Sequence, residues 1–422
     1  MNKTIKKVIA SILVVATLVG IFFLGYFIRD LTTDSELREA YNFLQTYKNY
    51  YLYDDEGNLV KDIANAILDD YSEYYTKEEY QKVKLEAYGN MMGIGLTFRG
   101  NSLKIYGVLG NSPCKIAGIK AGGVITQINV GSGYKELSSY NDFANEFDLV
   151  KDNGYLSLKI DYNGEVLEYS VQKREYKRTF VDYYDSQGSY TFSDASGQMQ
   201  LIKTSEETPV VSDKIGYIKY EKFYGRDSGI TGSAGQILEV MNKFKQDGKS
   251  QVIIDLRGNG GGYVEVFKNM VVNFIDGDKS GKNLVSYAVD KNGAIEYTYA
   301  NGSKYSEYGF ENIIILADEN TASASESFIG AVLDYDKTNK VTLLVASSTL
   351  NGETVYKTYG KGIMQSTYKH IDGSAVKLTV AQIYWPLSNT CIHKVGVIGE
   401  KTGKILAVDK DKMLEKAFEI CS

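Results

Sequence analysis

The chain has 422 residues, 43% of them hydrophobic and 24% charged, which is the balance of a globular protein with two or three domains. Its net charge of −6 and the lack of a long basic run argue against nucleic acid as a partner. The three cysteines, Cys114, Cys391 and Cys421, are too few and too scattered for a disulfide framework or a zinc site. We therefore expect neither a metal nor another cofactor.

The amino terminus has the pattern of a membrane anchor. Three lysines precede an apolar run at 8–28, whose 21 residues at about 1.5 Å each can cross a bilayer core of roughly 30 Å. The positive flank predicts a cytoplasmic amino terminus, with the rest of the chain outside. A cleaved signal peptide is the alternative, but bulky residues fill 22–28, where cleavage needs small ones. We predict that residues 1–29 are the cytoplasmic tip and single-pass anchor of a cell-membrane protein.

Residues 30–89 are predicted to form a helical arm. Leu37, Tyr41 and Leu44 recur at helical spacing, and Thr76 with Glu79 has the pattern of a capping box before a further helix. These apolar stripes suit packing against the rest of the chain or against a second copy. A homodimer through the helices is therefore a candidate assembly.

Residues 90–175 change to short strands and glycine-rich turns. A glycine-rich loop enters the first of these strands: Gly93, Ile94, Gly95 and Leu96. This loop, followed by the segment 112–125, resembles a PDZ domain, although Cys114 and Gly123 replace the usual alanine and aspartate. The resemblance implies that N–H groups of the loop bind the carboxylate of a peptide terminus, which adds as a strand. The alternative is that these glycines only form a tight turn.

From residue 176 onward, apolar strands alternate with helical stripes. We expect strands at 215–220, 252–256, 313–316 and 341–345. Such alternation predicts an α/β layer for residues 176–422. Two segments resemble insertions into it: a polar, turn-rich stretch at 177–213 and a surface hairpin at 278–310.

Ser323 is a candidate nucleophile. It follows a buried strand and a turn, and it opens an apolar helix between Ala322 and Ala324. Unpaired N–H groups and the helix dipole at such a position can stabilise a developing oxyanion. The alternative is an ordinary N-cap serine.

A serine nucleophile needs a base, and the chain has only two histidines, His370 and His393. Neither lies in a local sequence that favours catalysis. Lys361 stands between two glycines and before apolar residues, and burial would lower its pKa towards neutrality. Gln365 could hold its amine by a hydrogen bond. The alternative is that Lys361 is a surface lysine.

A glycine run at 258–262 follows a predicted strand and could supply a second oxyanion donor. It is not a dinucleotide-binding fingerprint, because Tyr263 stands where the last glycine is needed. The segment 399–404 is not a P-loop, because its spacing is wrong and Ile405 replaces the Ser or Thr.

Taken in order, these motifs resemble the tail-specific, or C-terminal processing, serine peptidases. The matching segments are 71–76, 216–219, 254–262, 321–326, 358–365, 378–381 and 392–397. The resemblance implies a mixed α/β multidomain fold, with a ClpP/crotonase-like α/β peptidase core and an inserted PDZ domain. The helical segment and the transmembrane helix would precede them.

The same resemblance implies roles for individual residues. Ser323, rather than Ser325, corresponds to the nucleophile, Lys361 to the general base and Gln365 to the residue that orients it. The oxyanion donors correspond to the N–H of Ala324 and that of Gly261 or Gly262. Glu326 corresponds to an acidic position with a supporting role.

The chain departs from the family pattern at two places near these residues. Gly260 replaces the usual proline, and the span from Ser323 to Lys361 contains an apparent insertion at 347–354. The expected function is a membrane-anchored, extracytoplasmic serine endopeptidase with a Ser-Lys dyad, acting on protein or peptide substrates with accessible C-termini. The alternatives are a catalytically inactive PDZ-containing scaffold protein on the same fold and, less favoured, a hydrolase that uses a histidine.

Overall fold

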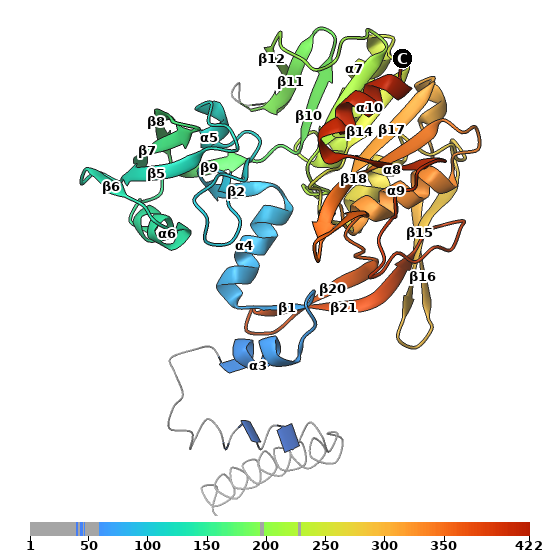
Figure 1. Ribbon diagram of the computed structural model, residues 1–422. Helices are drawn as coiled ribbons and strands as arrows, with labels where there is room; N and C mark the ends of the chain where they lie inside the picture. The colour runs from blue at the N-terminus through green and yellow to red at the C-terminus, as the bar shows by residue number, and fades with distance from the viewer. Residues whose placement is uncertain (1–38, 41–42, 45, 47–58, 195–197, 227–228) are drawn as a thin grey trace, which may run out of the picture. The chain divides into compact units, whose positions relative to one another are not determined.

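A computed structural model describes residues 39–40, 43–44, 46, 59–194, 198–226 and 229–422 (Figure 1). The chain divides into two units, Met1–Ile67 and Leu68–Ser422. The predicted anchor at 1–29 lies outside the described residues. Within the described ranges, no helix is both long enough and apolar enough to cross a membrane.

The predicted helical arm is confirmed in two places and wrong between them. Helix α3 (Leu59–Ile67) ends the first unit, and α4 (Lys77–Ala87) begins with the predicted capping box, in which Thr76 N donates to Glu79 Oε2 at 2.9 Å. Between them lies strand β1 (Glu73–Tyr75), which pairs with the strand β21 (Ala375–Tyr384). Tyrosines favour strands, and two of those in β1 are buried, so tertiary pairing overrides the helical pattern here.

Residues 90–177 form a small β-rich subdomain with a core of its own. Its elements are β2 (Asn90–Gly93), β3 (Leu96–Thr97), β4 (Gly107–Val108), α5 (Pro113–Ile116), β5 (Val124–Asn129), β6 (Tyr134–Glu136), α6 (Tyr140–Asp148), β7 (Tyr155–Tyr162), β8 (Glu165–Gln172) and β9 (Arg174–Lys177). The main sheet has the order β6-β5-β7-β8. Cys114, Ile125 and Leu158 are buried in the core between this sheet and the two helices.

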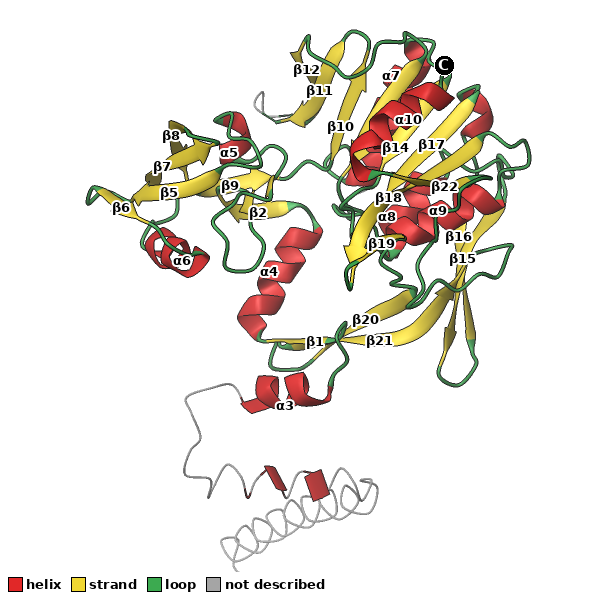
Figure 2. Cartoon of the chain, in the orientation of Figure 1, coloured by secondary structure: helices red, strands yellow, loops and turns green. Residues whose placement is uncertain are grey.

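A nine-stranded sheet forms the centre of the rest of the second unit (Figure 2). Its strands are β10 (Val181–Asp185), β11 (Gly188–Ser193), β12 (Gln200–Ser205), β13 (Ile215–Tyr220), β14 (Gln251–Asp255), β17 (Asn312–Ala317), β18 (Val341–Leu350), β19 (Glu353–Tyr356) and β22 (Ile405–Val408). Strands β13, β14, β17, β18 and β22 are parallel, as their apolar sequences predict.

The segment 177–213, predicted to be a turn-rich insertion, forms strands rather than loops. It supplies β10, β11 and β12, which extend the sheet in antiparallel pairs. Its polar residues alternate with apolar ones, and Tyr183 and Phe192 are fully buried. A strand that buries only one face needs only every second residue to be apolar, so its average composition resembles that of a loop.

Helices cover both faces of this sheet. Helices α7 (Ser233–Gln246), α8 (Val264–Val271) and α9 (Ala324–Asp334) share one hydrophobic core with the face that carries Val252 and Ile313. Helix α10 (Met413–Ile420) packs on the face that carries Ile253 and Ile314. Because successive strand residues point to opposite faces, the apolar strands fill both cores.

A second sheet carries the lysine loop. Strands β15 (Lys282–Asp290), β16 (Ile295–Asn301) and β20 (Ile363–Lys369) join β1 and β21 in it. The predicted hairpin at 278–310 is confirmed as β15–β16, but it is not confined to the surface, because β15 pairs with β21 and buries Val285 and Ala288. The apparent insertion at 347–354 lies in the β18–β19 hairpin.

Candidate active site

Ser323 lies on a strained turn between β17 and α9. Its φ of 58° and ψ of −118° are rare for a residue with a side chain, which costs energy that the surroundings must offset. Ser325, the other serine of the motif, is fully buried, and its hydroxyl donates to the carbonyl of Asn259 at 2.9 Å. Ser323 therefore faces the cavity described below, whereas Ser325 fastens the turn to the glycine loop.

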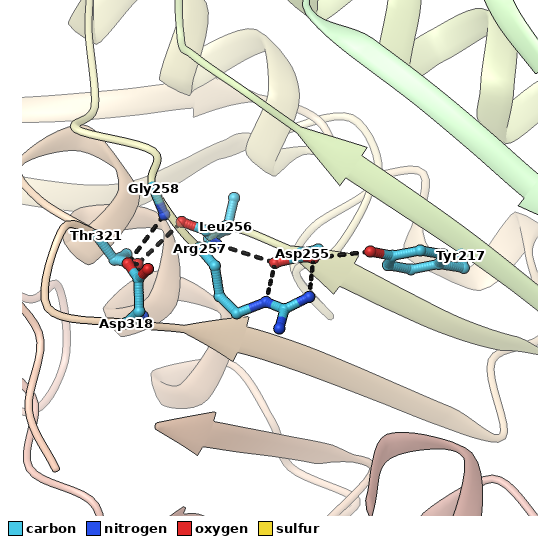
Figure 3. Close-up of polar contacts among 7 residues, drawn as sticks. All are labelled: Tyr217, Asp255, Leu256, Arg257, Gly258, Asp318 and Thr321. Carbon is cyan, nitrogen blue, oxygen red and sulfur yellow. Dashed lines mark hydrogen bonds and ion pairs between the residues drawn. The ribbon is translucent and has the colours of Figure 1, made fainter. Parts of the chain in front are cut away.

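Polar contacts lock this turn to the end of β14 (Figure 3). The hydroxyl of Thr321 donates to the carbonyl of Leu256, and the N–H of Gly258 donates to Asp318 Oδ1, both at 2.9 Å. The guanidinium of Arg257 donates two hydrogen bonds to the buried carboxylate of Asp255, from Nε to Oδ1 at 2.9 Å and from Nη2 to Oδ2 at 2.6 Å. The start of the glycine loop is thus fixed against the serine turn.

The glycine loop lies in close contact with the turn that carries Ser323. Gly261 has a φ of +90°, and a Cβ there would lie 2.6–2.8 Å from Ala322 O, Ala324 N and Ser323 Cβ. Its N–H donates to Asn259 Oδ1 at 2.9 Å. Within the described residues, the N–H groups of Gly262 and Ala324 have no acceptor. Of the predicted oxyanion donors, Gly262 and Ala324 are therefore available and Gly261 is occupied.

Glu326 joins the serine turn to the lysine loop. Its side chain is fully buried, and Oε2 accepts the N–H of Ser323 and of Lys361, each at 2.9 Å. Oε1 accepts the N–H of Gly360 at 2.8 Å and the hydroxyl of Thr358 at 2.5 Å. Burial raises the pKa of this carboxyl, and the four donors oppose that shift. One carboxylate thus holds both chain segments.

Lys361 lines the same cavity as Ser323, which has a volume of about 1040 Å³. Burial lowers the pKa of its amine, the charge of Lys377 lowers it further, and Asp69 opposes both. Among the described residues, the amine has no hydrogen bond and in particular none to Ser323 Oγ; it lies 5.4 Å from the centroid of the Tyr71 ring. The two groups share a cavity without the hydrogen bond of a formed dyad.

Gln365 does not hold the lysine amine directly, and this differs from the prediction. Its side-chain N–H donates to the carbonyl of Tyr71. The ring of Tyr71 in turn lies edge-on to Tyr359 and His393, with centroids 6.5 and 6.3 Å apart. Tyr71 is the residue near the amine that the sequence analysis missed. The match of 71–76 to the peptidase pattern was the signal that could have found it.

Neither histidine lines the cavity. His370 Nδ1 is hydrogen bonded to Ser374 Oγ at 3.0 Å at the end of β20. Burial and the neighbouring Lys394 lower the pKa of His393, which packs beside Tyr71. Within the described part of the chain, no group of His, Cys, Asp or Glu side chains could hold a metal ion.

The loop at 93–96 lies in the small subdomain, and none of its residues lines the cavity. Two of its carbonyls bond within the subdomain: that of Ile94 accepts the N–H of Cys114 at 3.0 Å, and that of Gly95 accepts the N–H of Leu109 at 2.8 Å. Gly95 has a φ of +82°, and Ser112 fills the space that a side chain there would need. The structure therefore places this loop apart from Ser323 and Lys361.

A serine on a strained helix start, beside a glycine loop and a half-buried lysine, is the arrangement of a serine hydrolase site. Residues 214–400 match the model of peptidase family S41. A CtpA-like serine protease of Staphylococcus aureus is 26% identical over 371 residues, which cover 86% of this chain and 63% of the relative. One from Staphylococcus saprophyticus is 27% identical over 376 residues, with 87% and 65% covered.

The fold agrees with these matches. A crystal structure of a candidate S41 protease from Bacteroides fragilis superposes with a TM-score of 0.52 at 16% identity, covering 86% of each chain. These matches agree with the resemblance found in the sequence, since the family model and the relatives are both of serine peptidases of family S41. It spans 63% of the length of the Staphylococcus aureus relative.

Proposed function

We propose that the protein is a serine endopeptidase in which Ser323 is the nucleophile and Lys361 the general base. The carrying observation is the buried carboxylate of Glu326, which accepts the N–H of both residues. Because the two chain segments are tied to one carboxylate, their backbones keep a fixed separation at one cavity. We expect rotation of the Lys361 side chain to bring its amine to the serine.

The proposed reaction uses groups that this geometry supplies. Neutral Lys361 takes the Ser323 proton as Oγ attacks the peptide carbonyl, and it returns that proton to the leaving amine. The N–H groups of Ala324 and Gly262 stabilise the oxyanion. Water then hydrolyses the acyl-enzyme by the same route. Gln365 acts in this proposal by holding Tyr71, whose ring lies near the amine, rather than by contacting the amine itself.

The lowered pKa of Lys361 supports its assignment as base. A lysine with an unperturbed pKa is almost fully protonated at neutral pH and cannot accept a proton. Burial enlarges the neutral fraction, and the long side chain can reach a neighbouring group by rotation. Catalytic hydrogen bonds are often absent before substrate binds, so the missing Ser323–Lys361 bond is compatible with this role.

The finer parts of the proposal concern the substrate and the location. The strand order and the anchored glycine turn of residues 90–177 support a PDZ domain that captures a protein C-terminus as an added strand. The core would then be ClpP/crotonase-like, and the apolar run at 8–28 would anchor the enzyme with its catalytic part outside the cytoplasm. Relatives described as CtpA-like serine proteases support a C-terminal processing role.

Substitution of the dyad tests the catalytic proposal. Cleavage of an unfolded protein substrate should fall to background in Ser323→Ala and in Lys361→Ala, with unchanged circular dichroism spectra. Lys369→Ala is the matched control, since Lys369 is exposed at the far end of β20, the strand that follows Lys361. Full activity in either dyad variant would refute the mechanism.

A binding or scaffold protein on the same fold is the second candidate, and the unmade Ser323–Lys361 hydrogen bond is the observation that favours it. In that case the unaltered protein should bind peptide C-termini and cleave none of them. Measurable cleavage that depends on Ser323 would exclude it.

A further inference from the structure

The cavity beside Ser323 is basic, although the whole chain carries a net charge of −6. The charged side chains that line it from the peptidase core are Arg178, Asp182, Lys219, Glu221, Lys222, Arg257, Lys361 and Lys377. Six of these eight are cations. An excess of this size, inside a protein of opposite overall charge, favours an anionic ligand in the cavity.

Three of these cations have carboxylate partners within the protein. Arg178 pairs with Glu221 at 3.1 Å, Arg257 with Asp255 at 2.6 Å and Lys377 with Glu73 at 3.0 Å. Lys219, Lys222 and Lys361 form no ion pair within the described ranges. Lys361 is the proposed base and Lys219 is exposed, so Lys222 is the half-buried cation that has no ion pair among the described residues.

Lys222 is held next to the oxyanion loop. The following residue, Phe223, donates its N–H to Gly261 O at 3.1 Å, and its carbonyl accepts the N–H of Tyr263 at 2.9 Å. Gly261 itself lies against Ser323. The Lys222 amine lies 4.3 Å from the centroid of the Tyr224 ring, which also lines the cavity. The side chain is thus positioned at the edge of the reaction site.

The charge on Lys222 is unfavourable without a partner. Burial lowers the pKa of this amine, and the positive charges of Arg178 and Lys361 lower it further, whereas the carboxylates of Glu86 and Glu221 oppose the shift. A half-buried cation without a direct contact to a carboxylate has lost hydration without gaining an ion pair. A carboxylate brought into the cavity would offset the lost hydration of the Lys222 amine. This stabilisation exists only while a ligand is bound.

We infer that Lys222 binds a carboxylate of the substrate beside Ser323, so that the enzyme prefers acidic peptide segments near the cleaved bond. This inference rests on the proposed peptidase function, because it takes the bound peptide to be a substrate. The binding itself needs no cleavage. The carboxylate has two possible sources, an Asp or Glu side chain and the α-carboxylate of a chain end. Both offer the same charge-assisted hydrogen bonds to an amine.

A binding experiment tests the inference without relying on turnover. Fluorescent peptides that differ by one Glu-to-Gln exchange, all amidated at the C-terminus, are titrated by anisotropy against the Ser323→Ala variant of the full chain. We expect the Glu peptide to bind at least about tenfold more tightly, as a charge-assisted hydrogen bond allows. Adding Lys222→Gln should bring the ratio of the two Kd values close to one, whereas adding Lys222→Arg should preserve it.

Two further arms complete the test. Adding Lys416→Gln should leave the ratio unchanged, since this half-exposed lysine of α10 pairs with Glu419 away from the cavity. The Gln peptide with a free C-terminus reports on the α-carboxylate: tighter binding that is lost in Lys222→Gln assigns that source. Equal affinities for all peptides, or ratios that Lys222→Gln does not change, would overturn the inference. Cleavage by the unaltered protein is scored separately, so a failed dyad and a failed carboxylate site give different results.

Discussion

Ser323 lies on a turn whose neighbours are fixed by buried hydrogen bonds, whereas the amine of Lys361 enters the cavity without one among the described residues. The backbones of both residues are nonetheless held by the same carboxylate, Glu326. The contrast is therefore between a rigidly held serine and a lysine whose backbone is fixed while its amine is free to rotate. In such a site, positioning errors would arise from side-chain rotation rather than from movement of the two loops.

The largest expected effect comes from removing the shared carboxylate. Glu326→Ala leaves four donors without their acceptor, and each buried unsatisfied donor costs about 1–3 kcal/mol, so the free energy of unfolding should fall by more than about 4 kcal/mol. Urea denaturation measures this loss, and cleavage should vanish with it. The control is Glu307→Ala, which removes an exposed ion pair with Lys245 and should cost less than about 1 kcal/mol. Similar losses in both variants would show that Glu326 does not join the two loops.

A smaller effect should follow from crowding the serine turn. Gly261→Ala introduces a Cβ against Ala322, Ser323 and Ala324 at a positive φ, and strain and overpacking together should cost about 2–5 kcal/mol. Gly260→Ala is the matched control one residue earlier, because nothing lies within 4 Å of its added Cβ. Thermal unfolding and peptide cleavage should both separate the two variants. A tolerated Gly261→Ala would mean that the nucleophile is less rigidly held than the structure shows.

The pH dependence of cleavage should report on Lys361 as the proposed base. Cleavage should increase with pH as Lys361 loses its proton, with a midpoint below the ordinary lysine value of 10.5. Lys377→Gln removes a positive charge that lowers the pKa of Lys361, so the rising limb of kcat/KM should move to higher pH. Asp69→Asn removes a negative charge that raises this pKa, so the limb should move to lower pH. Shifts in the same direction for both variants would contradict Lys361 as the base.

The same lowered pKa predicts the direction of a stability change. Between the folded-state value and 10.5, the unfolded chain binds more protons at Lys361 than the folded one does, so this residue's contribution to stability rises with pH across that window. Below the window its charge opposes folding. Lys361→Met should therefore raise the free energy of unfolding at neutral pH while abolishing cleavage. A destabilised Lys361→Met variant would indicate that the lysine is structural.

Local chemistry was sufficient to predict the serine turn and its helix. A small-residue run after an apolar strand leaves few alternatives, and the motif order separated Ser323 from Ser325. The strand β1 was not predictable in the same way, since its pairing partner in β21 is about 300 residues away in sequence. The partner of Gln365 was missed for the same reason. Neighbours brought together by sheet pairing have no signature in the spacing of either segment alone.

The hydrogen bond between Gln365 and Tyr71 joins residues 294 positions apart, and β1 is the strand that brings them together. Contacts of such high sequence separation form slowly, because loop closure must come before the contact that rewards it. We expect the contact between Tyr71 and Gln365, beside the Lys361 amine, to form late in folding, after the nine-stranded sheet. An isolated fragment limited to residues 214–400 would contain both Ser323 and Lys361 yet lack Tyr71. We therefore expect cleavage to require the tyrosine segment that precedes the small subdomain.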